Sequence, residues 1–318
     1  WAIQDDILKM STTLDGMNEQ WGESMKRLLL VVNPCAGKQL IRNYMVEVVS
    51  LLGQYGYSST VHITTGRGDA TEVVSKWGSN FEAVVVVGGD GSLNEVINGV
   101  LSIRGNQPKV GYIPAGSTND FAKTLSLPTN IIDAAHRIGQ GKPRPMDVGE
   151  CNGRYFTYIA TFGAFTESSY NASQKVKNVL GHFAYVLESV KSLKNLRTYK
   201  TRIETEDKVI EGEFLFGGAI NSTSMGGLFK FDPENVKLDD GLFEIVLVKK
   251  NNNLFKLLKA VTDMKKPEYE SDVVVTCKAS KLKITAEENI DWCLDGELGG
   301  TYKEAEIQNL KRAIQLIK

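Results

Sequence analysis

The sequence predicts an α/β protein with an N-terminal doubly wound, mostly parallel sheet and a C-terminal β-rich, antiparallel, sandwich-like domain. Before about residue 145, short apolar runs are each followed by a polar or glycine-rich loop and then, in most cases, by apolar residues at helical spacing. After that point, alternating apolar and polar runs prevail. We therefore expect domains at 25–144 and 145–301, with 1–24 as an extension. Whether 302–318 completes the first domain is left open.

Composition narrows the class of protein. The chain has 318 residues with 37 Lys and Arg against 38 Asp and Glu, and this near-zero charge argues against a nucleic-acid binder. Its 4 cysteines are scattered, which argues against a structural zinc site or a disulfide framework and favours a reducing compartment. No apolar run approaches the roughly 20 residues that a membrane helix needs. We expect a cytoplasmic protein.

Four runs in the first domain read as strands, at 28–32, 57–63, 83–87 and 110–113, and the apolar runs at 28–32 and 83–87 read as strands buried on both faces. Apolar residues at helical spacing follow the first and third of these strands, at 41–52 and 93–100, and a short helix that ends at Trp77 is expected after Asp69. Each strand ends in a loop rich in glycine, threonine or asparagine. Because ligands bind at the carboxyl edge of open α/β sheets, we expect these loops to meet and form a site.

The loop at 88–91 is the most informative, because it reads Gly-Gly-Asp-Gly between a strand and a helix. Glycines leave backbone N–H groups open to an anion, and the helix N-terminus adds a favourable dipole. Ser92 is the expected N-cap of the helix that continues from Leu93. Asp90 is a candidate to hold a metal ion beside phosphates, directly or through water. The alternative is that Asp90 is an ordinary turn residue.

Common nucleotide signatures are absent. The P-loop pattern fails because Lys38 is followed by Gln39, and the dinucleotide-binding pattern fails in the 88–91 loop. Protein-kinase signatures are also missing. The first loop can still bind phosphate through the backbone of Gly37 and the charge of Lys38. The alternative is a turn with a solvated lysine.

The second domain is expected to contain a hairpin at Asn152-Gly153. Further strands are predicted at 200–206, 212–220, 242–248, 273–277, 282–285 and 291–294. Helical patterns are predicted at 173–196 and 254–264. The first of these carries lysines among its apolar residues, so it either meets an anionic membrane or packs on its own sheet. Residues 225–229 are a second candidate for lipid contact, with a tight turn as the alternative.

Five separated motifs carry a family resemblance. They are Asn-Pro-Cys-Ala-Gly-Lys at 33–38, Gly-Gly-Asp-Gly-Ser-Leu-Asn-Glu at 88–95, Gly-Ser-Thr-Asn-Asp-Phe-Ala at 116–122, Leu-Asp-Asp-Gly-Leu-Phe-Glu at 238–244 and Leu-Asp-Gly-Glu at 294–297. Together they resemble the diacylglycerol kinase and sphingosine kinase superfamily, and the soluble bacterial diacylglycerol kinase-like lipid kinases most of all. The resemblance runs from Met25 to the C-terminus.

The resemblance implies an ATP-dependent kinase that phosphorylates a lipid hydroxyl, with diacylglycerol as the leading acceptor and phosphatidic acid as the product. Three alternatives stay open. One is a kinase for a sphingoid or other lipid alcohol. Another is an enzyme like the kinase of nicotinamide dinucleotide, and the last is a non-catalytic protein that binds nucleotide and lipid. The 119–121 and 295–297 stretches argue against the dinucleotide kinase, and retention of the acidic residues argues against loss of catalysis.

Carried over by position, the resemblance assigns ATP binding to one set of residues. They are Asn33, Pro34, Cys35, Ala36, Gly37, Lys38, Thr64, Gly89, Asp90, Gly91, Ser92, Leu93, Asn94, Glu95, Ser117 and Asp120. Ser92 and Ser117 stand where the family usually has threonine, and both keep a hydroxyl. Mg²⁺ would bridge the phosphates near Asp90, with Lys38 and Asp120 completing a charge network. Asp120 has a compatible second role as a helix cap.

Asp295 and Glu297 are the candidates for the catalytic base. Residues two apart in an extended segment point to the same side, so the two carboxylates could share one site. One would accept the proton of the lipid hydroxyl and the other would orient it or help hold metal. Which carboxylate acts is left open. The alternative is a β-turn with solvated acids.

The resemblance also implies a structural Mg²⁺ held by the Asp240 carboxylate and by the carbonyls of Lys237 and Leu242. Such oxygen donors suit this ion, and an Asp-Gly turn is expected there in any case. The expected partners are ATP and a lipid substrate at the inner membrane surface, where the enzyme would associate peripherally. No nucleic-acid partner is expected, and the sequence leaves a monomer and a homodimer open.

Overall fold

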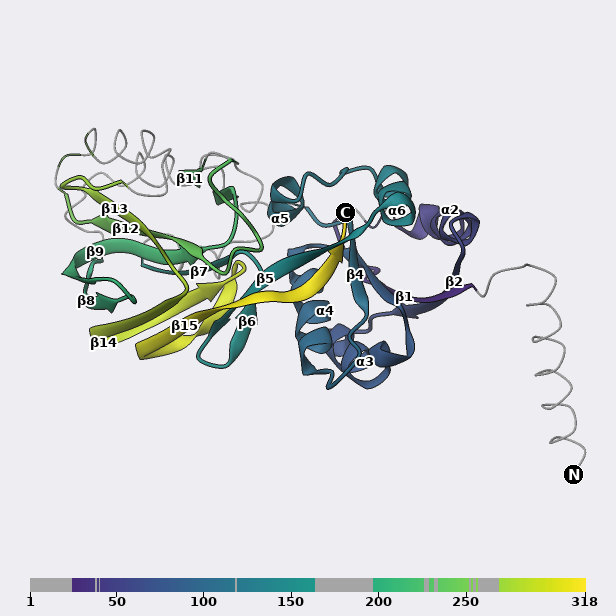
Figure 1. Ribbon diagram of the computed structural model, residues 1–318, viewed down its shortest axis with the longest axis horizontal. Helices are drawn as coiled ribbons and strands as arrows, with labels where there is room; N and C mark the ends of the chain where they lie inside the picture. Colours follow the sequence, from purple (N-terminus) through teal and green to yellow (C-terminus); the bar gives the residue numbers. More distant parts are fainter. Residues whose placement is uncertain are drawn as a thin grey trace, which may run out of the picture.

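The structure is a computed structural model, and it describes residues 25–37, 39, 41–117, 119–163, 197–225, 229–231, 234–251, 253, 256 and 269–318. Some predictions therefore lie outside the described residues. They concern the extension at 1–24, the helix at 173–196, all but residue 256 of the helix at 254–264, residues 226–228 and Lys38. The described chain forms two lobes side by side, one α/β and one built almost entirely of strands (Figure 1). This confirms a mixed α/β fold with a strand-rich C-terminal part.

The first lobe repeats strand, loop and helix. Its elements are β1 (Lys26–Val32), α2 (Ile41–Gln54), β2 (Tyr57–Ile63), α3 (Asp69–Trp77), the 3₁₀ turn η1 (Gly78–Asn80), β3 (Ala83–Gly88), α4 (Asp90–Ser102), β4 (Lys109–Pro114), α5 (Asp120–Thr124) and α6 (Ile131–Gln140). The strands lie in the order β2-β1-β3-β4, and every neighbouring pair is parallel. Parallel strands need crossover connections, and the helices supply them.

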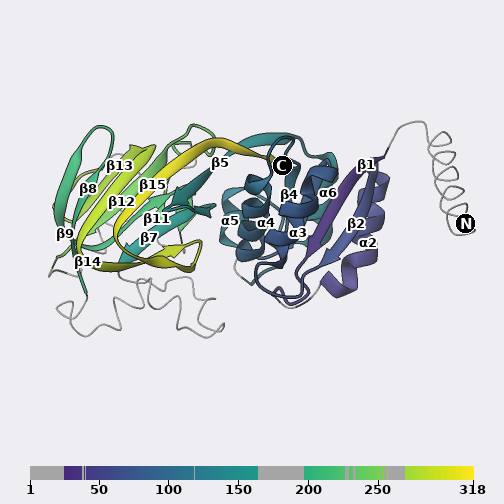
Figure 2. The same ribbon diagram turned by 90° about the horizontal axis from the view of Figure 1, so that it is seen from below.

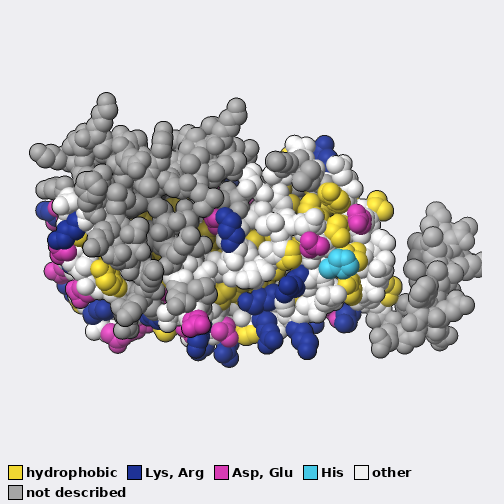
Figure 3. Space-filling view, turned by 90° about the horizontal axis from the view of Figure 1, so that it is seen from above, with side chains coloured by type: hydrophobic (Ala, Val, Ile, Leu, Met, Phe, Trp, Pro, Cys, Tyr) yellow, Lys and Arg dark blue, Asp and Glu magenta, His cyan; other side chains and the backbone are white. Residues whose placement is uncertain are grey.

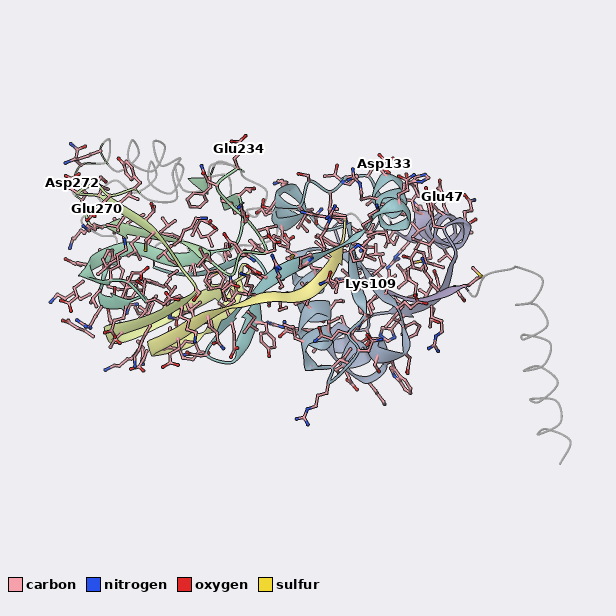
Figure 4. All side chains as sticks on the ribbon, in the orientation of Figure 1. Glu47, Lys109, Asp133, Glu234, Glu270 and Asp272 are labelled. Atoms are coloured by element: carbon pink, nitrogen blue, oxygen red, sulfur yellow. The ribbon has the colours of Figure 1, made fainter. Side chains whose placement is uncertain are left out.

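Helices cover both faces of this sheet because β1, β3 and β4 bury apolar side chains on both faces, whereas the edge strand β2 is partly exposed. Leu28 and Leu30 point to the face covered by α2 and α6, while Leu29 points to the face covered by α3 and α4. Figures 1 and 2 show the two helix pairs on opposite sides of the strands. Glu47 on α2 and Asp133 on α6 are exposed and point away from the sheet (Figure 4).

The second lobe is an antiparallel array. It contains β5 (Pro143–Cys151), β6 (Arg154–Phe156), β7 (Ile159–Gly163), β8 (Tyr199–Glu204), β9 (Val209–Ile220), β10 (Ser224–Met225), β11 (Phe229–Lys230), β12 (Phe243–Lys249), β13 (Val274–Ala279), β14 (Lys281–Leu294) and β15 (Glu297–Ile317). The hairpin predicted at Asn152-Gly153 is confirmed, with φ of 46° and 80° joining β5 to β6. The two strands predicted at 282–285 and 291–294 are parts of β14, whose register shifts between Thr285 and Ile290.

The strand β15 joins the two lobes. It begins in the second lobe, pairs antiparallel with β14 and β5, and ends beside β4, where Leu316 pairs with Val110 in parallel. Figure 2 shows this strand running from one lobe to the other. The core is continuous across the junction, since Val96 and Phe121 of the first lobe belong to the same buried cluster as Tyr158. The start of β15 therefore lies beside the loops of the first lobe.

Candidate active site

The loops that follow β1, β3 and β4 touch through their glycines. The backbone N–H of Ala115 donates to the Gly88 carbonyl at 2.7 Å. A Cβ placed on Gly37 would lie 2.4 Å from the Ala115 oxygen, and one on Gly116 would lie 2.6 Å from the Gly89 Cα. Only glycine allows backbones to approach this closely. The three loops therefore form one continuous backbone surface at the carboxyl edge of the sheet.

Asn33 links the first of these loops to the helix that follows β3. Its Oδ1 accepts from the Cys35 N–H at 3.0 Å, and its Nδ2 donates to the Ser92 hydroxyl oxygen at 3.0 Å. Ser92 is therefore not the helix cap, and that prediction is wrong. Gly89 is the N-cap, α4 begins at Asp90, and no side chain caps it. Among the described residues, no side chain accepts from the first N–H groups of α4, which lie at the surface formed by the three glycine loops.

Asp90 is used to hold a neighbouring element. Its Oδ2 accepts from the Asp120 N–H at 3.0 Å, and its Oδ1 accepts from the Phe121 N–H at 3.4 Å and the Tyr112 hydroxyl at 3.3 Å. Asp120 was expected to cap α5, but it is the first helical residue and donates to Asp90 instead. Burial raises the pKa of Asp90 to about 6, and the charges of Asp120 and Asp295 add to this rise.

The loop between β2 and α3 is tied to the same helix. Glu95 of α4 accepts from the Gly68 N–H at 2.9 Å, and Thr64 donates its N–H to the Val32 carbonyl at 2.9 Å. The Glu95 side chain thus positions the loop that carries Thr64. Between these two anchors lies Arg67, which sequence reasoning missed because an arginine in a glycine-rich turn has no pattern of its own.

Asp295 is almost fully buried, at 7% exposure, and its carboxylate is saturated with donors. Its Oδ2 accepts from the Thr157 N–H and hydroxyl, each at 2.7 Å, and from the Asn94 Nδ2 at 2.8 Å. Its Oδ1 accepts from the N–H groups of Tyr158 at 3.0 Å and Ile159 at 3.1 Å. Burial raises the pKa of Asp295, and the donated hydrogen bonds oppose that rise because they favour the ionised form. Asp295 therefore ties the second lobe to α4.

The geometry expected for 295–297 is wrong, because the segment is a tight turn and not an extended strand. Asp295 and Gly296 have φ of 50° and 86° and form a two-residue hairpin between β14 and β15. Their neighbour Glu297 starts β15, and its side chain is 52% exposed. A Cβ placed on Gly91 would lie 3.5 Å from the Glu297 Oε1. Glu297, unlike Asp295, is thus an accessible carboxylate at the start of α4.

The other residues assigned to ATP divide into two groups. Cys35 and Ser117 are exposed on the loops, and Pro34 is half-buried beside them. The Leu93 side chain is fully buried in the core, and that of Asn94 faces Asp295. Leu93 and Asn94 therefore have only their backbones to offer to a ligand at this edge. The Ala36 side chain is also buried, at 8% exposure.

The predicted structural metal site lies in the second lobe. Asp240 Oδ1 accepts from the Leu242 N–H at 3.0 Å, so the expected Asp-Gly turn is present. The Lys278 ammonium lies 3.9 Å from Asp240 Oδ2 and 3.1 Å from Oε1 of Glu244, which is 1% exposed. Burial raises the pKa of Glu244 to about 7, while Lys278 opposes that rise. A cation of the protein itself thus lies at this site.

Asp147 supports the same turn and was missed from the sequence. It is fully buried, and its carboxylate accepts from the N–H groups of Gly241 and Arg312, each at 2.7 Å. Burial raises the pKa of Asp147. The available signal was an acidic residue inside an otherwise apolar run at 146–148.

A glycine-lined sheet edge, faced by an acid from a second lobe, suits phosphoryl transfer, because backbone N–H groups can bind phosphate and the acid can accept a proton. Residues 27–151 match the family model of the diacylglycerol kinase catalytic domain, and residues 163–317 match that of the YegS C-terminal NAD kinase beta sandwich-like domain. The diacylglycerol kinase of Bacillus subtilis is 35% identical over 296 residues, covering 92% of this chain and 96% of that protein. That of Staphylococcus carnosus is 36% identical over 293 residues, covering 92% and 94%. The chain belongs to the diacylglycerol kinase family.

A solved structure agrees. The crystal structure of a putative diacylglycerol kinase from Bacillus anthracis has a TM-score of 0.78 and 26% identity, covering 93% of this chain and 98% of that one. The resemblance seen in the motifs is thus confirmed over both lobes, and the protein is a lipid kinase of this family. Among the described residues, no helix is long and apolar enough to cross a membrane.

Proposed function

We propose that this protein transfers the γ-phosphoryl group of ATP to the hydroxyl of diacylglycerol and produces phosphatidic acid. The curated relatives named diacylglycerol kinase support this substrate. The observation that carries the proposal is the place of Glu297, whose Oε1 would lie 3.5 Å from a Cβ on Gly91. An acid from the second lobe thereby meets the glycine loops of the first, where phosphate and alcohol would have to meet.

ATP would bind at the surface formed by the three glycine loops. Backbone N–H groups at the start of α4 favour phosphate through hydrogen bonds and through the helix dipole. The exposed Ser117 hydroxyl and the loop at 33–37 border the same surface. Thr64 and Asp120 lie on elements tied to α4 by Glu95 and Asp90. We assign the remaining predicted ATP residues, Leu93 and Asn94, to structural support of this surface.

Glu297 is the proposed base, and Asp295 is a positioning residue. A base must reach the proton that it accepts, and Glu297 is exposed beside the site. Asp295 has no free lone pair facing the site, because five donors already use its two oxygens. Its hydrogen bonds instead hold the β14–β15 turn against α4 and so set the position of Glu297.

The candidate donors are all oxygen atoms, which suit Mg²⁺, but the Lys278 ammonium lies 3.9 Å from Asp240 Oδ2 and would have to move aside for an ion at that site. Asp240 with the carbonyls of Lys237 and Leu242 would hold a structural ion. Asp90, whose oxygens already accept hydrogen bonds, would act on an ion through water. Among the described residues, no three acidic, cysteine or histidine side chains are placed so that they could hold a metal ion together. When bound, Mg²⁺ would neutralise charge on the transferred phosphoryl group.

The domain assignment is part of the proposal. We assign nucleotide binding to a doubly wound domain at 25–144, completed by the end of β15, and lipid binding to a sandwich-like domain at 145–301. The parallel pairing of Leu316 with Val110 of β4 supports completion of the first domain by the end of β15.

Peripheral attachment to an anionic membrane is also proposed. Lys142, Arg144 and Lys318 are exposed, and they lie together where the start of β5 meets the end of β15. Figure 3 shows Lys and Arg side chains gathered near the junction of the lobes. Basic clusters bind anionic lipid surfaces electrostatically.

The test measures the transfer of label from γ-labelled ATP to each of three acceptors in separate reactions. Diacylglycerol and a sphingoid base are supplied in detergent micelles, and NAD is supplied in solution. Label in phosphatidic acid is expected, and it should vanish in Glu297→Gln. Label in another lipid would change the acceptor, and label in NADP would replace the proposal with a dinucleotide kinase. Binding of ATP and lipid without any transfer would mean a non-catalytic protein.

A further inference from the structure

The proposed base is held in an ion pair by a residue of the other lobe. Arg67 Nη2 donates to Glu297 Oε2 at 2.5 Å, across 230 residues of sequence. The Glu297 Oε1 points toward Gly91 in the first turn of α4. In this state one oxygen of the carboxylate is occupied by the guanidinium, so that oxygen cannot contact a substrate hydroxyl.

The pair is built so that it opens easily. Arg67 and Glu297 are 75% and 52% exposed, and ion pairs in water contribute only about 0–1 kcal/mol. Arg67 lies between Gly66, where a Cβ would meet nothing within 4 Å, and Gly68, with φ of 85°. The backbone on both sides is anchored, by Thr65 to Asp69 and by Gly68 to Glu95. The side chain can therefore swing while its loop stays in place.

The carboxylate and a bound nucleotide would compete for the same positive groups. Glu297 lies at the N-terminus of α4, where the helix dipole and free N–H groups favour an anion. A triphosphate there carries more charge than the carboxylate, and its oxygens match the planar fork of arginine. Like charges would also repel Glu297 from the phosphates.

We propose that Arg67 is a latch that pairs with Glu297 in the nucleotide-free enzyme and moves to the terminal phosphates when ATP binds. This movement of the Arg67 side chain frees Glu297 to accept the proton of the lipid hydroxyl. The base therefore becomes active only when ATP, the phosphoryl donor, is bound. Arg67 is thus a positioning residue for the base and a specificity residue for polyphosphate. The inference rests on the proposed function of this site.

The experiment is a double-mutant cycle on nucleotide binding, measured by titration calorimetry with ATP and AMP. The proteins are wild type, Arg67→Met, Glu297→Gln and the double variant, with Arg104→Met as a charge-matched control. Arg104 is exposed and follows the opposite end of α4. Arg67→Met should weaken ATP binding about tenfold, as expected for the loss of a charge-assisted phosphate contact. AMP binding should stay within about twofold, because AMP lacks the terminal phosphates.

The double-mutant cycle tests whether Arg67 exchanges Glu297 for the phosphates of ATP. Glu297→Gln should tighten ATP binding about fivefold in the wild-type background, because Glu297 then no longer competes with ATP for Arg67. In the Arg67→Met background the same change should tighten ATP binding by a smaller factor. Arg67→Lys should recover part of the affinity. In steady state, Arg67→Met should raise KM for ATP far more than Arg104→Met does.

Two outcomes would refute the proposed role of Arg67 but leave the proposed kinase function intact. One is an equal effect of Glu297→Gln in both backgrounds, and another is unchanged ATP affinity in Arg67→Met. A merely structural pair would instead lower the unfolding temperature of both single variants alike and leave ATP affinity unchanged. If the wild-type protein fails to bind ATP at all, the proposed function fails and the latch with it.

Discussion

The two acids of the β14–β15 turn should separate cleanly into one that stabilises the fold and one that serves the reaction. We predict that Asp295→Asn lowers the free energy of unfolding, while Glu297→Gln leaves it unchanged and abolishes phosphoryl transfer. The pair is well matched, because each change replaces a carboxylate by an amide of the same shape. Asn also tolerates the φ of 50° at position 295 and suits the first position of this turn type, so the backbone is not strained.

The magnitude follows from the hydrogen bonds of Asp295. An amide keeps one acceptor oxygen and turns the other into a donor. If the oxygen stays on the side of Thr157, the N–H groups of Tyr158 and Ile159 lose their acceptor and face an NH₂ group. Each buried, unpaired N–H costs about 1–3 kcal/mol, so we expect a loss of about 2–4 kcal/mol after partial relaxation. That is a large part of the 5–15 kcal/mol typical of a whole domain.

For Glu297→Gln the side chain is 52% exposed, and surface changes of this kind stay within about 0.5 kcal/mol. Loss of a general base should lower kcat by about 100-fold to 10,000-fold. Urea denaturation followed by circular dichroism measures the free energy of unfolding, and label transfer from ATP to diacylglycerol measures kcat. If Asp295→Asn is as stable as wild type, Asp295 does not hold the turn. If Glu297→Gln keeps its activity, the base lies elsewhere.

Three further predictions test the surroundings of the site. Cys35 is exposed while the other cysteines are buried, so a thiol reagent should label Cys35 quickly, and ATP should slow that labelling. If ATP leaves the labelling rate unchanged, the nucleotide does not contact the loop after β1. Gly37→Ala places a Cβ 2.4 Å from a backbone oxygen at a φ of 50° and should weaken ATP binding more than tenfold, or by about 1.4 kcal/mol. In the control Gly66→Ala, the new Cβ meets nothing within 4 Å, and ATP binding should not change. Equal effects of the two variants in calorimetry would show that ATP does not depend on the close approach of the loops at Gly37. Lys278→Met leaves the buried Glu244 without its counter-ion and should cost about 1–3 kcal/mol in urea denaturation at pH 9, where the acid is ionised in the wild type, and much less at pH 6, where it is protonated. A second change of Glu244 to Leu should largely restore the stability at pH 9. A single variant as stable as wild type at pH 9 would show that the pair is unimportant.

Local patterns were sufficient for the strands of the first lobe, for the helices α2, α3 and α4 and for the hairpin at Asn152-Gly153, but α6 was not predicted. Apolar runs and helical spacing depend on neighbours in the sequence, and so does the need for positive φ in a tight turn. The same local reasoning failed at 295–297, where an extended segment was expected. It also failed at Ser92, whose hydroxyl accepts from Asn33 and does not cap α4. In the first case a turn reversed the direction of the side chains, and in the second a distant partner took the hydroxyl.

The sequence by itself determined the class of fold, the glycine loops and the acids from which the family can be read, since these depend on residue types at short spacing. Only the tertiary structure decided how those acids divide their work. Asp295 became a buried acceptor because the second lobe supplies its donors from 157–159 and α4 supplies Asn94. Glu297 meets Arg67 because the hydrogen bond from Asn94 to Asp295 holds the β14–β15 turn against α4, and contacts across 230 residues leave no local trace in the chain.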